Sequence, residues 1–345
     1  MNHSDIPTSK IILFGEGVGI ANVLSLLLHE PGMRVCAVVP RLNKNTGKAE
    51  NSDLFVKLAS DNKIPVLNSP NINSDFFLKS ILDFSPNLLV NWGHGQVFKE
   101  KLRTVTVSGV LNLHPGLLPA GRGSGAVVGE IWNGKKTIGM VAHIMDEHID
   151  RGRIIMSRSL EITGYEYQDE INKCVMEGAA EFLLEAIKLV LTGTKGEAVN
   201  GFGRYYPKLA NGDDIIDWSL TSDFLVRRIR SRSPVILSRT FKNSDKSEIF
   251  IRRASLSDVQ PYFSPVGQVL DRQEGLGILV KTGDTAIWIE EISLDKSHFF
   301  VPKFPIGTTF LSNWLNEFVG LNRQISALRH DLEELKNTLL SAKLT

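Results

Sequence analysis

The sequence predicts an α/β fold with a doubly wound, parallel-rich sheet, followed by a small antiparallel β barrel and a C-terminal coiled-coil helix. Three observations support this. In the first 200 residues, short apolar runs alternate with amphipathic segments, as in parallel strands and their crossover helices. From residue 201, strand-like runs are separated by turn residues. The last 35 residues carry apolar heptads. The expected domains are 1–200, 201–308 and 309–345.

Each element of the first region is expected from its own pattern. The run at residues 10–14 is apolar without alternation, which predicts a strand covered on both faces. Ligands are expected at the carboxyl ends of such strands. The other expected elements are strands at 34–39, 64–67, 88–91 and 110–113, and helices at 20–28, 53–60, 76–84 and 166–191.

The composition is that of an ordinary globular protein. Of the 345 residues, 42% are hydrophobic and 22% are charged. The net charge of +1 lacks the excess of basic residues expected of a protein that binds a nucleic-acid backbone over its whole surface. Cys36 and Cys174 favour free thiols in a reducing compartment. No run approaches 18 apolar residues, and the N-terminus has no apolar core. We therefore expect a cytoplasmic protein without a signal peptide or membrane span.

Three glycines follow the first expected strand, at Gly15, Gly17 and Gly19. Ile20 stands where the third glycine of the dinucleotide-binding pattern GxGxxG belongs, and the second strand ends without an acid for a ribose. A tight strand-to-helix turn, which needs glycine where φ is positive, explains the pattern better than a cofactor does. A nicotinamide-dependent dehydrogenase is the alternative, and failure to bind NAD(P) would exclude it.

Residues 111–155 hold side chains suited to carbonyl chemistry. Asn112 and His114 end one expected strand, and Asp150 lies in an acidic turn after another. An amide can donate to an oxyanion, an imidazole can act as a base near neutral pH, and a carboxylate can orient that base. Each residue alone also fits an ordinary turn. Only their combination indicates a site.

The whole stretch resembles the folate-dependent formyltransferase family, whose pattern is N-x-H-P-x-L-L-P-x-x-R-G, a helix, a strand and M-D-E-x-x-D-x-G. The family includes methionyl-tRNA, glycinamide ribonucleotide and nucleotide-linked amino-sugar formyltransferases. The resemblance implies a Rossmann-like catalytic domain and formyl transfer from 10-formyltetrahydrofolate to an amine, with no metal. The matching residues are Asn112, His114, Pro115, Leu117, Leu118, Pro119, Arg122 and Gly123, then Met145, Asp146, Glu147, Asp150 and Gly152.

By this resemblance, the catalytic trio is Asn112, His114 and Asp150. Asn112 would stabilise the oxyanion, an effect typically worth about 3–4 kcal/mol per donor. His114 can donate to the same oxygen as an imidazolium or take a proton from the attacking nitrogen. Asp150 can raise the imidazole pKa and orient the ring. Which of its two roles His114 performs stays open.

The resemblance also implies that the folate pterin lies between two loops. One follows the strand at 88–91, and the other is the turn before Asp150. Their backbone N–H and C=O groups would form hydrogen bonds with the donors and acceptors along the edge of the pterin. His94 and His148 are expected as loop residues without a catalytic role, and His143 as a packing residue. The expected cofactor-binding residues are Gly95, Gln96, Val97, Met145, Asp146, Glu147 and His148.

Three departures from the family pattern bear on the amine acceptor. Gly116 replaces the serine common in the tRNA enzymes, which resembles some amino-sugar enzymes, and residues 124–129 lack the usual proline. The polar loop at 41–52 lacks the P-x-G-R-G run of the tRNA enzymes and is expected as a surface connection rather than a flap. The expected acceptor is a nucleotide-linked amino sugar, and charged initiator methionyl-tRNA is the alternative. A formyltetrahydrofolate hydrolase is disfavoured because it resembles only the first domain.

The second region resembles the C-terminal domain shared by methionyl-tRNA formyltransferases and several sugar formyltransferases, including an I-D-W motif at 216–218. An arginine cluster accompanies the helix expected at 221–231. It fits either RNA phosphates or a solvated face, so it does not decide the acceptor. Barrel strands are expected at 248–251, 267–270, 277–281 and 286–289.

The terminal segment predicts self-association. Its apolar residues keep a 3.5-residue period over four heptads, which favours a coiled coil over a helix docked on its own domain. Asp331 and Lys336 are placed to pair across helices. We therefore expect a homo-oligomer, and a catalytically silent coiled-coil scaffold is a further alternative. The heptad residues are Leu311, Trp314, Phe318, Leu321, Ile325, Leu328, Leu332, Leu335 and Leu339.

Overall fold

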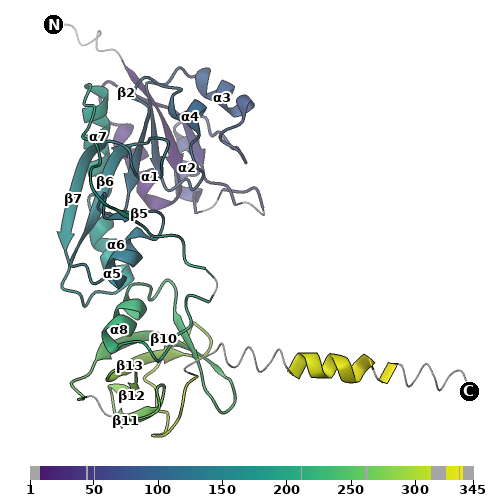
Figure 1. The fold of residues 1–345 in the computed structure, drawn as a ribbon. Coiled ribbons are helices and arrows are strands. Elements are labelled where there is room, and N and C mark those ends of the chain that lie inside the picture. The colour runs from purple at the N-terminus through teal and green to yellow at the C-terminus, as the bar shows by residue number, and fades with distance from the viewer. Residues whose placement is uncertain are drawn as a thin grey trace, which may run out of the picture. The chain divides into compact units, whose positions relative to one another are not determined.

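The computed structural model describes residues 8–43, 46–49, 51–210, 212–260, 263–311, 324–333 and 335–336. The chain divides into two compact units, Met1–Leu209 and Ala210–Thr345 (Figure 1). The first unit contains, in chain order, β1 (Ser9–Gly15), α1 (Gly17–Leu27), β2 (Met33–Pro40), α2 (Asp53–Asp61), α3 (Asp75–Leu82), β3 (Leu88–Trp92), α4 (Glu100–Arg103), β4 (Val110–His114), β5 (Gly121–Arg122), α5 (Ala126–Trp132), β6 (Thr137–Ile144), β7 (Ile154–Glu161), α6 (Gln168–Met176), α7 (Ala179–Leu191) and β8 (Arg204–Tyr205).

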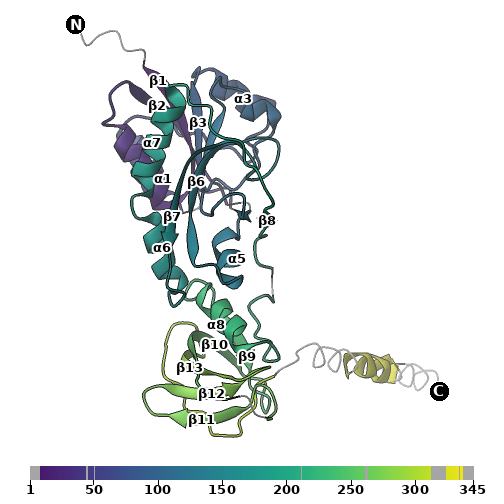
Figure 2. The ribbon, with the colours of Figure 1, turned by 60° about the vertical axis from the view of Figure 1, so that its left-hand side comes forward.

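The first unit is built on a six-stranded sheet in the order β2-β1-β3-β4-β6-β7. The first four strands of this order pair in parallel, and β6 and β7 join by antiparallel pairing. Helices α1 and α7 lie on one side of the sheet and α3 on the other (Figure 2). The predicted α/β fold with a parallel-rich sheet is confirmed.

Alternating residues of β1 enter two separate cores. Ile11 and Leu13 pack with residues of α1 and α7, whereas Ile12 and Phe14 pack with residues of α3. All four side chains are buried. The apolar run at 10–14 therefore lacks alternation because both faces of the strand are dry.

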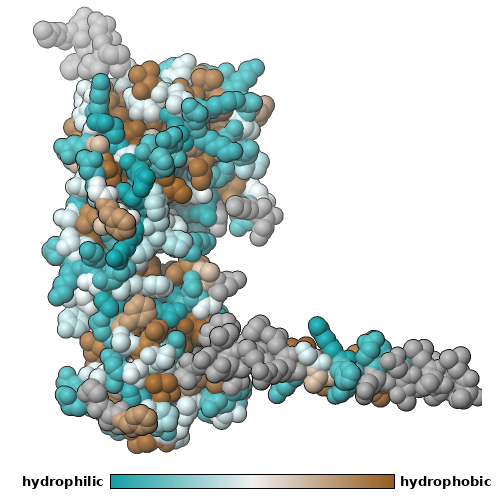
Figure 3. Space-filling view, viewed as in Figure 1, coloured by the Kyte–Doolittle hydropathy of each residue, from teal (hydrophilic) through white to brown (hydrophobic). Residues whose placement is uncertain are grey.

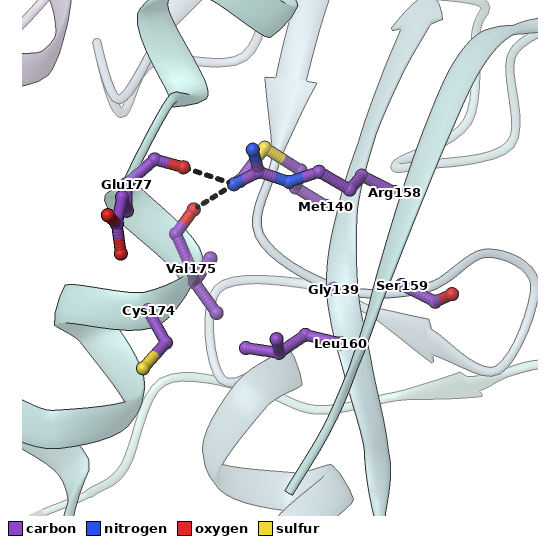
Figure 4. A pocket seen from close by; sticks show the side chains of 8 residues that line it. All are labelled: Gly139, Met140, Arg158, Ser159, Leu160, Cys174, Val175 and Glu177. Carbon is purple, nitrogen blue, oxygen red and sulfur yellow. Dashed lines mark hydrogen bonds between the residues drawn. The ribbon is translucent and has the colours of Figure 1, made fainter.

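The prediction of one helix at 166–191 is wrong, because α6 and α7 are separate. Gly178 between them has a φ of 65°, a left-handed conformation that ends helices. Arg158 of β7 donates through Nη2 to the carbonyl oxygens of Val175 (3.0 Å) and Glu177 (2.5 Å), beside a cavity of about 280 Å³ (Figure 4). These bonds satisfy carbonyls that the end of α6 leaves without helical partners.

The strand predicted at 64–67 is also wrong, since only the parallel bridge between Val38 and Val66 forms there. Val38 donates to the carbonyl oxygen of Pro65 and accepts from the N–H of Leu67, each at 2.8–2.9 Å. Pro65 has no N–H with which to extend the ladder. The segment therefore touches the sheet edge at one residue.

The second unit is an antiparallel barrel in the order β11-β12-β13-β10-β9. Residues 308–311 close it, because Phe310 N–H donates to Gly267 on the β11 side and Leu311 N–H donates to Phe241 of β9. Phe310 stacks on Trp218 in the core, with ring centroids 5.8 Å apart. The elements of this unit are α8 (Ser222–Arg230), β9 (Ser238–Phe241), β10 (Glu248–Leu256), β11 (Val269–Gln273), β12 (Gly277–Lys281) and β13 (Ala286–Ser293).

The arginine cluster at α8 points into its own unit. Arg230 and Arg232 are only 7% and 1% exposed. Arg228 and Arg232 both donate to the carbonyl oxygen of Asp213. A solvated face and an RNA contact both need exposed guanidinium groups, so neither expected role suits the two buried arginines. Arg228 and Arg232 instead hold the backbone at Asp213 against α8 and the residues that follow it.

The final helix described covers residues 324–333, which confirms a C-terminal helix there. Ile325, Leu328 and Leu332 are exposed on it, and Figure 3 shows hydrophilic and hydrophobic side chains along its surface. No helix in the described part of the chain has the length and apolar character to cross a membrane. Heptad residues outside the described part are Trp314, Phe318, Leu321 and Leu339.

Candidate active site

Three polar residues lie side by side on neighbouring strands of the first unit. Asn91 of β3 is the register partner of Asn112 on β4, and Asn112 is the partner of His143 on β6. All three side chains are buried. Burial removes their solvent partners, so each must find a hydrogen-bond partner in the protein.

These residues form a directed chain of hydrogen bonds. The backbone N–H of His94 donates to Asn91 Oδ1 (3.3 Å), Asn91 Nδ2 donates to Asn112 Oδ1 (2.7 Å), and Asn112 Nδ2 donates to His143 Nε2 (3.0 Å). A backbone N–H can only donate, so the Asn91 atom that faces it must be the oxygen, and this fixes the orientation of both amides. Asn112 then presents its NH₂ group to His143, and Nε2 of His143 is the acceptor. The hydrogen on His143 is then on Nδ1, which faces the Ile144 carbonyl oxygen at 3.4 Å. The second Asn112 amide hydrogen is left for another acceptor.

His114, at the end of β4, lies beside Asp150. Its Nε2 is 2.8 Å from the carbonyl oxygen of Gly121, which only accepts, so Nε2 carries the hydrogen. Nδ1 then presents a lone pair, 3.6 Å from Asp150 Oδ2. The other carboxylate oxygen is 3.5 Å from His143 Nε2. Asp150 therefore lies between two imidazoles, and Nδ1 and Oδ2 together form a place where a proton can be taken up.

The electrostatics of this pair follow from burial and hydrogen bonding. Burial lowers the pKa of His114, against the opposing effect of the Asp150 carboxylate. Burial by itself raises the pKa of Asp150, but the two imidazoles in their protonated forms and the Gly123 N–H, 2.7 Å from Oδ2, bring it below its usual value. At neutral pH, His114 is therefore neutral and Asp150 ionised. Within the described ranges, no group of three His, Cys, Asp or Glu side chains is placed to hold a metal.

The turn that presents Asp150 has an unusual backbone. Asp150 has a φ of 52°, a left-handed conformation that residues other than glycine seldom adopt. The carbonyl oxygen of Asp150 accepts from Nε of Arg122 (3.2 Å). A Cβ at Gly152 would lie 1.6 Å from the carbonyl oxygen of Ile144. The last residue of the M-D-E-x-x-D-x-G pattern must therefore be glycine, because the backbone at residue 152 lies directly against the backbone at the end of β6.

The first loop expected to hold the pterin follows β3. Gly95 has a φ of 80°, and a Cβ there would lie 3.1 Å from Arg41 Cζ. The Gln96 side chain accepts from the Ile72 N–H (3.3 Å) and donates to the Pro70 carbonyl oxygen (3.4 Å), so it is bonded to a different loop, at residues 70–72. Val97 is exposed. The positive φ favours glycine at position 95, and the Val97 side chain is open to solvent.

The second expected loop begins directly after β6. Met145 packs against the core cluster that contains Phe98, so the two loops share one face of the sheet. Asp146 Oδ1 accepts from the His148 N–H (2.9 Å). Glu147 and His148 are exposed and lie beside each other, with 3.8 Å between His148 Nδ1 and Glu147 Oε1. Met145 thus packs on the same core cluster as Phe98 of the first loop, whereas Glu147 and His148 lie at the surface.

Asn91 is not among the site residues expected from the sequence, and His143 is expected only as a packing residue. Both take part in orienting Asn112, since one bonds its oxygen and the other its nitrogen. The signal that could have found them is a polar residue near the end of an otherwise apolar, buried strand. Such a side chain needs a partner on a neighbouring strand.

His94 is a core residue rather than an ordinary loop residue. Its side chain is 0% exposed, and among the described residues neither ring nitrogen has a hydrogen-bond partner of normal geometry. The ring lies edge-on to Phe14 and Phe98, with centroids 5.7 and 6.2 Å away. Burial lowers the pKa of His94 to about 4, helped by the nearby Arg41 charge. His94 is therefore neutral near pH 7.

The glycines at the end of β1 and the start of α1 serve close packing or a left-handed backbone. A Cβ at Gly15 would lie 2.4 Å from the Trp92 carbonyl oxygen, and one at Gly19 would lie 2.5 Å from the Trp92 ring. Gly17 has a φ of 80°. Each glycine is accounted for by its backbone or by Trp92, which favours the strand-to-helix turn over a dinucleotide site.

Comparison with known families gives matches in both units. A sequence model of the family described as Formyl transferase matches residues 9–187, more than half of the chain. A second model, described as Formyl transferase, C-terminal domain, matches residues 208–300. The first match contains every residue of the expected site.

Two relatives are similar over most of their length. The methionyl-tRNA formyltransferase of Ruminiclostridium cellulolyticum is 27% identical over 292 residues, which is 84% of this chain and 93% of the relative. The methionyl-tRNA formyltransferase of Desulfotalea psychrophila is 27% identical over 294 residues, or 84% and 89% of the two chains.

Solved structures of low identity share the fold. The N-formyltransferase from Helicobacter canadensis, in complex with folinic acid and dTDP-3-aminofucose, has a TM-score of 0.62 at 17% identity and covers 82% of this chain and 99% of its own. HypX from Aquifex aeolicus with tetrahydrofolic acid has a TM-score of 0.53 at 18% identity and covers 86% and 48%.

Proposed function

The chain belongs to the formyl transferase family, and from this premise we propose that Asn112, His114 and Asp150 form its catalytic site. The enzyme is a folate-dependent N-formyltransferase, and 10-formyltetrahydrofolate is its formyl donor. The observation that carries the site proposal is the 3.6 Å approach of a neutral His114 Nδ1 to the Asp150 carboxylate, next to an amide of fixed orientation.

In the proposed reaction, the amine nitrogen of the acceptor bonds to the formyl carbon, and the bond between that carbon and the folate nitrogen breaks. The second amide hydrogen of Asn112 stabilises negative charge on the formyl oxygen. The pair of His114 and Asp150 takes the proton that the amine loses and returns a proton to the departing folate nitrogen. The neutral tautomer with hydrogen on Nε2 supports this role of His114 as a base.

Substitution of the trio tests this assignment. We expect Asn112→Ala to lower kcat roughly 10²–10³-fold, as for loss of other oxyanion donors, and Asp150→Asn and His114→Ala to lower it strongly as well. His298→Ala is the control, because it removes an exposed imidazole in the second unit. Full activity of His114→Ala or Asp150→Asn would reject the site.

For the acceptor we propose the amino group of methionyl-tRNA. What supports it is the similarity to methionyl-tRNA formyltransferases across 84% of this chain, which includes the second unit. This replaces the amino sugar as the favoured acceptor.

A nucleotide-linked amino sugar is the second candidate, favoured by two local observations. A Cβ at Gly116 would lie 2.8 Å from both His114 Nε2 and Ala126 Cβ, so the loop has no room for the serine common in the tRNA enzymes. Arg230 and Arg232 are buried and cannot meet RNA phosphates. Turnover of 10-formyltetrahydrofolate with charged initiator tRNA and with a panel of amino-sugar nucleotides decides between the two acceptors.

We further propose a cytoplasmic location and self-association through the terminal helix. Ile325, Leu328 and Leu332 form an exposed apolar stripe on the described helix, and Asp331 and Lys336 offer complementary charges to a second copy of this chain. The expected domain bounds are 200 and 308. In their place we propose a catalytic domain that ends near residue 209 and a barrel that ends near residue 311, followed by the terminal helix.

A further inference from the structure

A short segment at residues 203–207 pairs with the loop that follows His114. It lies between the two regions matched by family models and within the first compact unit. β8 pairs in parallel with β5. The N–H of Tyr206 donates to the Arg122 carbonyl oxygen (2.8 Å), and the N–H of Gly125 donates to the Tyr206 carbonyl oxygen (3.0 Å). We call residues 203–207 the docking segment.

Glycines in the adjoining loop and helix make room for the docking segment. A Cβ at Gly129 would lie 2.0 Å from the Tyr206 ring, one at Gly123 would lie 2.6 Å from the Tyr206 carbonyl oxygen, and one at Gly125 would lie 2.5 Å from the Pro207 carbonyl oxygen. Real side-chain atoms do not approach so closely, so each glycine is required by the docked chain. This accounts for glycines in a run that lacks the proline usual in the family.

Tyr205 connects the docking segment to the turn that carries Asp150. Its hydroxyl donates to the carbonyl oxygen of Ile149 (3.1 Å). The buried Arg122 lies over the Tyr205 ring at 5.5 Å and donates through Nε to the carbonyl oxygen of Asp150. Two consecutive carbonyl groups of the turn are thus held by Tyr205 and its stacking partner. A residue in a left-handed conformation, as Asp150 is, persists only where surrounding contacts enforce it.

We propose that Tyr205 is a positioning residue for the Asp150 carboxylate, and that the docking segment completes the catalytic unit. This inference rests on the proposed catalytic role of Asp150. Without the bond to Ile149, the turn loses one of its anchors, and Asp150 Oδ2 moves from its place beside His114 Nδ1 and the Gly123 N–H. Truncation near residue 200 would remove the segment and with it the support of the turn.

Tyr205→Phe tests the proposal, because it removes only the hydroxyl. The assay uses whichever acceptor gives the higher turnover. We expect kcat to fall roughly three- to tenfold, which corresponds to the loss of one hydrogen bond. In an NMR titration, the pKa of His114 should fall, because the carboxylate that raises it is less well placed. Tyr165→Phe, which removes a hydroxyl from an exposed tyrosine of the same unit, is the matched control and should change neither quantity.

The outcomes separate this proposal from the catalytic assignment. A wild-type kcat, or a lower kcat with an unchanged His114 titration, would overturn the role of Tyr205. If Asp150→Asn is inactive while Tyr205→Phe behaves as wild type, only the positioning role fails. If Asp150→Asn keeps full activity, the catalytic assignment itself fails. In the Asp150→Asn background, Tyr205→Phe should leave the residual kcat and the pKa of His114 unchanged. The proposal is also rejected if Tyr205→Phe lowers kcat in that background by the same factor as in the wild type.

Discussion

Asn112 donates its side-chain amide to Nε2 of His143 over 3.0 Å, and the two residues are register partners on β4 and β6. The bond holds one amide hydrogen and leaves the other for the formyl oxygen in the proposed reaction. An oxyanion donor is effective when its orientation is set before the reaction, because no reorganisation is then needed. His143 is therefore more than a packing residue in this fold.

Substitution of His143 should lower the reaction rate by loosening Asn112. His143→Phe removes the acceptor, and we expect kcat to fall on the order of tenfold, equivalent to about 1.4 kcal/mol of transition-state stabilisation. His143→Gln keeps an acceptor oxygen and should retain more activity. Steady-state kinetics of both variants measure the difference. Equal rates for the two would show that the hydrogen bond to Asn112 does not matter.

The activity should persist to an acidic pH. The proposed base is neutral His114, and burial lowers its pKa below the usual 6.5. Since protonation of His114 would end proton uptake, the acid limb of the kcat profile should have an apparent pKa below 6.5. A profile recorded from pH 5 to 9 at saturating substrate checks this. An apparent pKa clearly above 6.5 would contradict the neutral, buried state of His114.

Acid should destabilise the first unit through His94. The unfolded imidazole binds a proton near pH 6.5, whereas the folded one does so only near 4. Between these values the unfolded chain holds more protons, so the free energy of unfolding falls as the pH falls. Going from pH 7.5 to 5 should cost about 2 kcal/mol from this residue alone. His94→Phe keeps an aromatic ring and should lose less stability on acidification, as urea unfolding at both pH values would reveal.

Glu130 should act in the opposite direction. Its carboxyl on α5 is buried, its Oε2 has no hydrogen-bond partner among the described residues, and burial raises its pKa to about 7. Between pH 4.5 and 7 the folded chain therefore holds more protons than the unfolded chain, and stability falls as the pH rises. Glu130→Gln should be more stable than the wild type at pH 8 but not at pH 4. Denaturation midpoints at the two pH values test this sign.

Removal of the terminal helix should abolish self-association while leaving the barrel folded. The cut must follow Leu311, because Phe310 packs in the barrel core and Leu311 N–H bonds to β9. We expect a chain of residues 1–311 to be monomeric by light scattering and the full chain to be oligomeric. A chain ending at residue 308 should unfold the barrel. An unchanged oligomer for residues 1–311 would place the interface elsewhere.

Much of the fold follows from local pattern, and the errors have local causes too. The apolar strands and most helices are visible because their side chains repeat with the period of a strand or helix. The break at Gly178 is hidden inside a continuous amphipathic pattern, since the group that satisfies the end of α6 is Arg158 on a distant strand. The bridge at Val66 lacks a strand because Pro65 has no N–H.

The sequence by itself determines the reaction class, because Asn112, His114 and Asp150 lie in a long pattern of fixed spacing. The tertiary structure alone decides what holds them. Asn91, Asn112 and His143 come from segments 21 and 31 residues apart, and only strand register makes them neighbours. The docking of residues 203–207 likewise cannot be predicted from the sequence. A glycine indicates that there is no room for a side chain, but it does not indicate which distant residues fill the space.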